Sequence, residues 1–149
     1  MNKNILRRAK HAFILQEGQS ECGPTCLSIV GRFLGHPVSP LDARLRAGTS
    51  RTGTTLHGLL LAAQQLGFSA EGLRGNSLAL RTHEDPCILF VTVENGLQHF
   101  VAHLGFDGKK HIIADPAKGV LTLNEDELDA LWPTKRLLSI SSQHGSQKR

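Results

Sequence analysis

A polar loop that ends in Cys-Gly-Pro constrains the fold of this chain more than any other stretch. Residues 16–21 read Gln-Glu-Gly-Gln-Ser-Glu, and Cys22, Gly23 and Pro24 follow directly. Proline is favoured at the first position of a helix, where its missing N–H costs nothing. Apolar residues then recur at helical spacing, at Cys26, Ile29, Val30, Phe33 and Leu34. This pattern predicts a helix over residues 24–34 with one buried face, and Cys22 just before its start.

The position of Cys22 makes it the candidate nucleophile. A helix N-terminus carries roughly half a positive charge and several unpaired N–H groups, which favour the reactive thiolate form of a cysteine. The loop before Cys22 is too polar for the interior of a core, which argues against an inert buried thiol. Gln16 lies close enough along the chain to donate its side-chain amide to an oxyanion beside the thiol. Gln19 competes for that role, and spacing within the loop does not decide between them.

Two further helices are predicted in the first half of the chain. Ser39 and Pro40 read as the cap and first position of a short helix that ends near Gly48. Thr54 or Thr55 can cap the next helix, which ends near residue 67. Residues 1–12 are predicted to be a polar lead-in, and the domain itself is expected to span residues 13–140.

The second half of the chain has the pattern of a sheet. Apolar and β-branched runs predict strands at residues 68–72, 87–93, 98–106, 111–115, 120–123 and 137–140. Asn95-Gly96 and Asp107-Gly108 are hairpin signals, and residues 125–131 predict a short acidic helix. Residues 77–83 are ambiguous, and residues 141–149 are predicted to be a polar, disordered tail. Helices followed by an antiparallel meander define the α+β class.

The predicted hairpin around Asp107 brings a histidine near a carboxylate. Side chains alternate along a strand, so His99 and His103 share a face. Counting back from the turn places Asp115 opposite or nearly opposite His99 and Phe100, with Cβ atoms about 4.5–8 Å apart. A carboxylate in that position holds an imidazole in one tautomer and stabilises its charged form. His99 is therefore the candidate base and Asp115 its orienting group, and His103 is the rival base.

Composition excludes several other functions. The formal charge of +4 is modest, and seven Phe and Trp residues with no Tyr are too few for a nucleic-acid surface. No apolar run is long enough to span a bilayer, and no secretory signal is present, which favours a reducing compartment for the three cysteines. Cys26 and Cys87 lie in apolar patterns and are expected in the core. The spacing of Cys22 and Cys26 does not favour a metal site, and no cofactor is expected.

These residues together carry a resemblance to a known family. Gln16, the run Glu21-Cys22-Gly23-Pro24-Thr25-Cys26-Leu27, then His99-Phe100-Val101 and Asp115-Pro116-Ala117-Lys118-Gly119 resemble the C39 family of cysteine peptidases. The resemblance implies a papain-like fold, with Cys22 as nucleophile, His99 as general base, Asp115 as its orienting group and Gln16 as oxyanion donor. It covers nearly the whole chain, from about residue 13 to residue 140.

The same resemblance implies a substrate and a setting. Family members remove leader peptides after a Gly-Gly or Gly-Ala motif, coupled to export of bacteriocins and related peptides. The expected partners are a precursor with a helical leader that docks on a groove remote from the cysteine, and the transmembrane and ATPase domains of a transporter. The expected location is the cytoplasm, or its inner-membrane face. Because this chain contains neither transporter segment, it is expected to be an excised domain or a free-standing protease.

Two alternatives from other classes remain open from the sequence. The chain could be a module that binds leader peptides for an exporter without cutting them. It could also be a papain-like transferase or amidohydrolase that acts on an amine or a glutamine.

Overall fold

The transition from polar loop to apolar run at Cys22 produces the central helix of the molecule. The computed structural model describes residues 4–143, and its helix α2 spans Cys22–Phe33 after a 3-10 turn at Gln19–Glu21. The helix begins at Cys22 itself, whereas the sequence predicted a start at Pro24. Every residue from Cys22 to Gly31 is buried, because other elements surround α2 on several sides.

Two helices on the far side of α2 form where their capping signals predict them. Helix α3 (Pro40–Ala47) is capped by Ser39, whose Oγ accepts a hydrogen bond from Asp42 N at 3.0 Å. Helix α4 (Leu56–Gln65) is capped by Thr55, whose Oγ1 accepts from Gly58 N at 2.9 Å. Helix α3 ends at Gly48, which has a left-handed conformation with φ +69.

The N-terminal segment differs from the polar lead-in predicted for residues 1–12. Residues Ile5–Ala12 form helix α1, and Ile5, Ala9 and Ala12 are buried against the core that α2 shares with the sheet. Ile5 sits so close to Gly105 that a Cβ there would lie 2.9 Å from its Cδ1 atom. The signal was weak in the sequence because this apolar stripe is interrupted by arginine, lysine and histidine.

Six antiparallel strands form one sheet. In chain order they are β1 (Phe68–Arg74), β2 (Cys87–Thr92), β3 (Gln98–Phe106), β4 (His111–Asp115), β5 (Gly119–Leu123) and β6 (Arg136–Ser142). Their spatial order is β1-β6-β2-β3-β4-β5. The predicted meander is therefore correct for β2 to β5 and wrong for β6, which returns to lie between β1 and β2. A central position suits β6 because Leu137, Leu138 and Ile140 are buried on both of its faces.

The remaining segments complete this half of the molecule. The ambiguous residues around 77–83 contain a short 3-10 turn at Ala79–Arg81, and another at Glu94–Gly96 joins β2 to β3. Helix α5 (Glu125–Leu131) has a capping box between Asn124 and Glu127. The predicted polar tail differs at its start, because Ser141 and Ser142 continue β6. Residues 144–149 lie outside the described residues.

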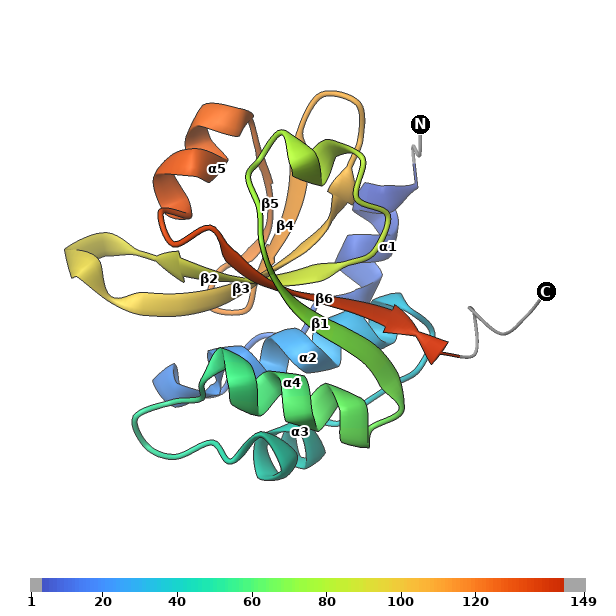
Figure 1. The fold of residues 1–149 in the computed structure, drawn as a ribbon, viewed down its shortest axis with the longest axis vertical. Coiled ribbons are helices and arrows are strands. Elements are labelled where there is room, and N and C mark those ends of the chain that lie inside the picture. Colours follow the sequence, from blue (N-terminus) through green and yellow to red (C-terminus); the bar gives the residue numbers. More distant parts are fainter. Residues whose placement is uncertain (1–3, 144–149) are drawn as a thin grey trace.

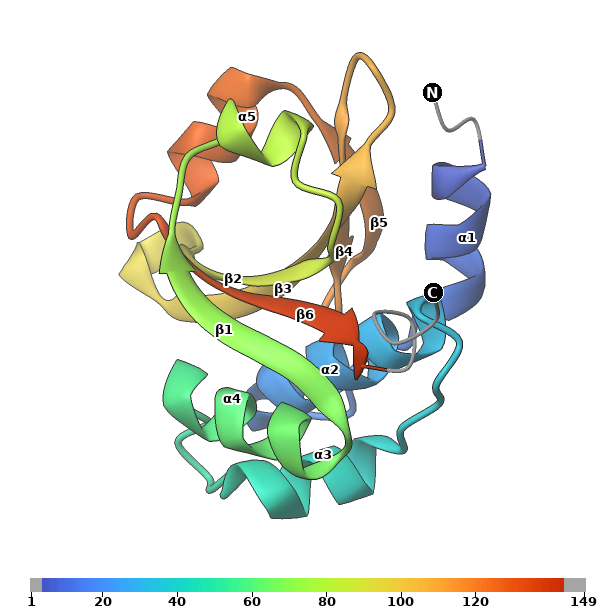
Figure 2. The same cartoon turned by 45° about the vertical axis from the view of Figure 1, so that its right-hand side comes forward.

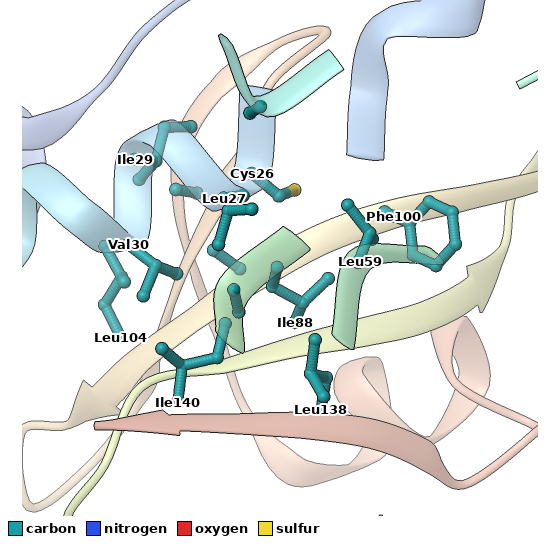
Figure 3. Packing of buried hydrophobic residues seen from close by; sticks show 14 of the residues in the cluster. Cys26, Leu27, Ile29, Val30, Leu59, Ile88, Phe100, Leu104, Leu138 and Ile140 are labelled. Carbon is teal, nitrogen blue, oxygen red and sulfur yellow. The ribbon is translucent and has the colours of Figure 1, made fainter. Parts of the chain in front are cut away.

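The two faces of the sheet are covered by different layers. Helices α2 and α4 pack on one face, with α1 beside α2, and α5 lies on the opposite side (Figure 1). The turned view shows the sheet curving between α5 and the three helices α2, α3 and α4 (Figure 2). In the larger core, Leu27 of α2 points toward Ile88 and Ile140 of the sheet (Figure 3). The smaller core, around Leu128 and Trp132, lies under α5.

Candidate active site

Cys22 occupies the first turn of α2 at the wall of a cavity. Its side chain is 8% exposed, and the first turn of the helix contains no acidic residue that would oppose a thiolate. The preceding residue, Glu21, is engaged elsewhere, because its carboxylate accepts from Arg44 Nε at 2.8 Å. The cavity has a volume of about 360 Å³. The helix N-terminus therefore presents a largely buried thiol to a small, accessible space.

His99 and Asp115 form a direct hydrogen bond. His99 Nε2 lies 2.8 Å from Asp115 Oδ1, and the two side chains are 12% and 6% exposed. The same carboxylate oxygen accepts from the backbone N–H of Ala117 at 2.9 Å. Since Nε2 is engaged by Asp115, Nδ1 is the imidazole nitrogen left to interact with the thiol of Cys22. The predicted pairing of these two residues is confirmed by this contact.

The hairpin differs from the sequence count first in the length of its turn. Strands β3 and β4 pair Phe106 with His111, so the turn is longer than the two residues expected, and this moves Asp115 away from His99 along β3. A β-bulge between His103 and Gly105 then shifts the register by one residue and brings Asp115 one position back toward His99. Continuing that register places Asp115 level with Val101, two residues from His99. The contact between His99 and Asp115 is thus a diagonal one, which remains within reach of long side chains.

Charge around His99 favours its protonated form. Burial by itself would lower the pKa of His99, but hydrogen bonds to Asp115 and Cys22, with the negative charge of both groups, raise that pKa to about 9. Burial raises the pKa of Asp115, but the hydrogen bonds from His99 and from Ala117 N–H lower it below its ordinary value overall. At neutral pH this arrangement favours the imidazolium form of His99 beside the side chain of Cys22.

The rival base His103 lies in a different environment. His103 Nε2 is 2.9 Å from His111 Nδ1, and both side chains are buried on the far part of the hairpin. Burial, followed by the charges of His111 and His83, lowers the pKa of His103 to about 3. The structure therefore places His99, and not His103, against a carboxylate and the candidate nucleophile.

The two candidate oxyanion donors are placed differently. Gln16 donates from Nε2 to the backbone oxygen of Gly18 at 2.7 Å, and its own backbone N–H donates to Pro116 O at 2.8 Å. Its Oε1 is buried, with no hydrogen-bond partner among residues 4–143. Gln19 lines the cavity together with Cys22. The Gln16 backbone contact ties the loop before Cys22 to the loop after Asp115.

The other cysteines behave as core residues, as predicted. Cys26 and Cys87 have no exposed surface, and all three cysteines are free thiols. Burial, with smaller contributions from Cys22 and Asp115, raises the pKa of Cys26 well above its ordinary value. Burial similarly raises the pKa of Cys87 to about 12. Within the described part of the chain, no group of three or more His, Cys, Asp or Glu side chains is arranged to hold a metal ion.

Sequence reasoning missed the walls of the cavity. One wall is the loop and first turn at residues 52–57, and the other is formed by Phe90, Gln98, Phe100 and Arg136 of the sheet. These residues come from four separate segments of the chain, so no local sequence motif predicts that they line one cavity. Thr52, Thr54 and Thr55 precede α4. The sequence predicted only that they belong to a loop and to the cap of that helix.

Comparison with known proteins identifies the family of this chain. The model of the Peptidase C39 family matches residues 10–144. The chain belongs to the peptidase C39 family. This C39 domain superposes with a TM-score of 0.78 on a double glycine motif protease from an AMS/PCAT transporter, crystallised with the leader peptide. Their sequences are 31% identical over 88% of this chain and 91% of that chain.

A second solved structure supports the same fold. The peptidase domain of Streptococcus ComA, a bifunctional ABC transporter involved in quorum sensing, matches with a TM-score of 0.78. The two are 26% identical over 87% of this chain and 97% of that chain. The predicted α+β, papain-like cysteine peptidase fold is confirmed by these two matches.

Relatives of this C39 domain fall into two kinds. An uncharacterized protein of Methanothermobacter marburgensis is 35% identical over 113 residues, covering 76% of this chain and 77% of that protein. The colicin V secretion/processing ATP-binding protein CvaB of Escherichia coli is 29% identical over 138 residues, covering 87% of this chain but 19% of that protein. None of the helices between residues 4 and 143 has the length and apolarity needed to cross a membrane.

Proposed function

We propose that this C39 domain is a cysteine endopeptidase that cleaves a precursor peptide after a Gly-Gly-type motif and so removes a leader. The observation that carries the proposal is the assembly of Cys22, His99 and Asp115 around the N-terminus of α2. Support for the substrate comes from the similar protease crystallised with a leader peptide, and from relatives named for bacteriocin processing and transport.

The chemistry follows from the charges at the site. Cys22 Sγ attacks the carbonyl carbon of the scissile peptide bond, while the His99 imidazolium holds the proton that the thiol has lost. The tetrahedral intermediate collapses when His99 gives that proton to the leaving amine, which releases the mature peptide. His99 then takes a proton from water, whose oxygen attacks the thioester and frees the leader. Asp115 keeps the imidazole oriented and stabilises its positive charge throughout.

The developing oxyanion needs donors beside Cys22. The backbone N–H of Cys22, at the start of α2, is one such donor. We assign the second to the side-chain amide of Gln16, on the basis of the family motif. That role requires the amide to leave its contact with Gly18 O when substrate binds. Gln19, at the cavity wall, is the alternative donor.

Selectivity for glycine is expected from the shape of the approach to Cys22. The peptide must enter between the loop at residues 52–55 and the aromatic rings of Phe90 and Phe100, which line opposite walls of the cavity. A backbone without side chains fits such a space, whereas an added methyl group must displace packed atoms at a cost of about 1–3 kcal/mol.

Two settings are consistent with the relatives. We infer that the domain works either beside the transmembrane and ATPase domains of an exporter, at the cytoplasmic face of a membrane, or as a free-standing protease. Exporter relatives contain the matched region as a small part of a longer chain, and the Methanothermobacter proteins contain it as most of theirs. A peptide with a helical leader is the proposed partner in both settings.

The decisive experiment uses a precursor peptide encoded beside the gene of this protein. We expect mass spectrometry to show a single cut after the small-residue pair, and Cys22→Ala to abolish the cut while leader binding and fold survive. A series with Gly, Ala, Ser, Val and Leu at each of the two positions should show steeply falling kcat/KM. Binding without cleavage by the parent protein would favour a non-cutting module, and a flat series would favour a general papain-like hydrolase or transferase.

A further inference from the structure

The outer face of α1 and the end of α2 together form a basic surface. Its exposed basic side chains are Arg7, Arg8, Lys10 and His11 of α1 and Arg32 of α2. We call these residues the α1 patch. Within residues 4–143 the structure records no ion pair for any member of the patch, whereas Arg44, Arg46 and Arg81 each pair with a carboxylate. The positive charge of the α1 patch therefore faces solvent without a neutralising partner.

Two arginines of the patch are held in place by backbone oxygens. Arg8 Nη2 donates to Phe33 O at 3.1 Å, and its guanidinium lies 4.0 Å from the centroid of the Phe33 ring. Arg32 Nη2 donates to His11 O at 3.1 Å. Each bond uses one of the several N–H donors that a guanidinium has. The remaining donors are presented in a fixed arrangement around a cavity of about 400 Å³, which Arg7 and His11 also line.

The acidic residues of the chain are concentrated elsewhere. Helix α5 has Glu125, Asp126 and Glu127 in its first turn, whereas the first turn of α1 contains no acidic residue. Helix α5 lies on the opposite side of the sheet from α1 and α2 (Figures 1 and 2). This separation gives the molecule a basic side and an acidic side, which orients it toward a negatively charged surface.

The contacts of the patch favour a lipid surface over a nucleic acid. The guanidinium of Arg8 covers the ring of Phe33, so that ring is not available to stack on a base. The apolar face of α1 is also occupied, because Ile5, Ala9 and Ala12 are buried in the core. Helix α1 cannot insert an apolar face between lipid chains, so its binding must be electrostatic and confined to the headgroups.

We propose that the α1 patch binds the surface of a membrane that contains anionic lipids, whose phosphate groups contact Arg7, Arg8 and Arg32. This inference goes beyond the proposed function and does not depend on it. Cys22 begins α2 and Phe33 ends it, so the patch and the thiol are separated by the length of the helix, about 16 Å. A domain bound through the patch therefore keeps the cavity beside Cys22 open to a peptide.

The test measures sedimentation of the protein with vesicles of one part phosphatidylglycerol to two parts phosphatidylcholine, and with vesicles of phosphatidylcholine alone. We expect binding only to the first kind, and loss of that binding at about 1 M salt. Arg7→Gln combined with Lys10→Gln should lower the partition coefficient about 25-fold, because each basic residue near the surface contributes about fivefold. Within the described residues neither side chain has a recorded hydrogen bond, so this variant should fold like the parent.

The matched control removes two positive charges at the other end of α2, by Arg51→Gln combined with Arg74→Gln. Both arginines are exposed and lie next to the cavity beside Cys22, since Arg51 precedes Thr52 and Arg74 pairs with Arg136 across β1 and β6. The control should change vesicle binding less than about twofold, because charges far from the lipid surface are screened by salt.

Three results would overturn the inference. The first is equal binding to vesicles with and without phosphatidylglycerol, and the second is an equal loss of binding in the two double variants. The third is tighter binding to a short DNA duplex than to the vesicles, lost in the variant of Arg7 and Lys10, which would assign the patch to nucleic acid. That variant should cleave a soluble Gly-Gly peptide at the rate of the parent. Failure of the parent to cleave would count against the proposed function alone.

Discussion

Strands β3 and β4 contain two hydrogen-bonded pairs, His99 with Asp115 and His103 with His111. The surroundings of the two pairs shift the pKa values of His99 and His103 in opposite directions. At one end of the hairpin, His99 bonds to Asp115, and its pKa is raised to about 9. At the other end His103 bonds to His111, and its pKa is lowered to about 3. Burial lowers the pKa in both cases, so the difference comes from the partner. A carboxylate and a thiol stabilise a charged imidazole, and a second imidazole does not.

This difference separates a reactive site from a structural one on the same two strands. The pair at His99 reaches the end of the sheet where α2 begins, and it is poised to hold and release a proton. The pair at His103 is covered by α5, whose Glu125 accepts from His111 at 3.3 Å and also pairs with Arg81. We interpret His103 and His111 as two neutral imidazoles that are hydrogen-bonded to each other beside the smaller core.

Exchange of each histidine for alanine gives the largest expected contrast. His99→Ala should lower kcat/KM about 10⁴-fold or more in protein that still folds, because the proton donor to the leaving amine is lost. His103→Ala should leave cleavage largely intact and cost about 1–3 kcal/mol of folding free energy, since His111 loses its partner. Peptide cleavage and urea denaturation of both variants measure the two effects. Loss of turnover in folded His103→Ala protein would reverse the assignment of the base.

A second pair of variants decides between the candidate oxyanion donors. Gln16→Ala should slow the chemical step about 10²–10³-fold with leader affinity unchanged, because the donor acts on charge that exists only in the transition state. Gln19→Ala serves as the matched control and should change the single-turnover rate much less. If the single-turnover rate holds in Gln16→Ala while affinity falls, Gln16 is a substrate contact and Gln19 becomes the donor.

Removal of the Asp115 carboxylate should lower turnover less than removal of the His99 imidazole does. In Asp115→Ala, burial of His99 is no longer offset by its strongest partner, so the pKa of His99 should fall and its imidazolium form should be less populated at neutral pH. We expect turnover to fall roughly ten- to hundredfold. NMR titration of His99 checks the mechanism, and an unchanged pKa with unchanged turnover would remove Asp115 from the site.

The sequence predicted the parts of the molecule that depend on local signals. Ser39 and Thr55 cap helices as expected, and β3 and β4 have the predicted bounds, because capping and hairpin residues act on their immediate neighbours. The helix that begins at Cys22 was recognisable for the same reason. The bulge near Gly105 was missed, since one extra residue in a strand leaves no pattern in the sequence.

Features that depend on contacts between distant segments could not be predicted from local sequence patterns. Strand β6 joins the centre of the sheet through pairings with β1 and β2, and α1 is held by contacts such as that of Ile5 with Gly105. The cavity beside Cys22 likewise combines a loop, a helix start and three strands. The contact between His99 and Asp115 could be predicted from the sequence, but the residues that line the cavity could not.

The pH dependence of stability offers the finest test of the two histidine pairs. The neutral form of His103 is favoured in the folded state, since burial, then His111 and His83, lower its pKa from 6.5 to about 3. Above pH 6.5 this contribution to stability is fully present, and it is lost as pH falls toward 3, because the unfolded chain takes up a proton that the folded chain does not. His99 has the opposite sign. Its contribution is fully present below pH 6.5 and is lost as pH rises through about 9.

The two variants should therefore change opposite limbs of the stability profile. Measured by urea denaturation from pH 4 to pH 10, His103→Ala should lose less stability than the parent between about pH 6.5 and pH 4, and His99→Ala should lose less toward about pH 9. Glu125 and Arg81 remain around His111 in both proteins, so their contributions cancel in the comparison with the parent. If both variants ran parallel to the parent at every pH, neither histidine would titrate as its surroundings require, and the contrast between the two pairs would be wrong.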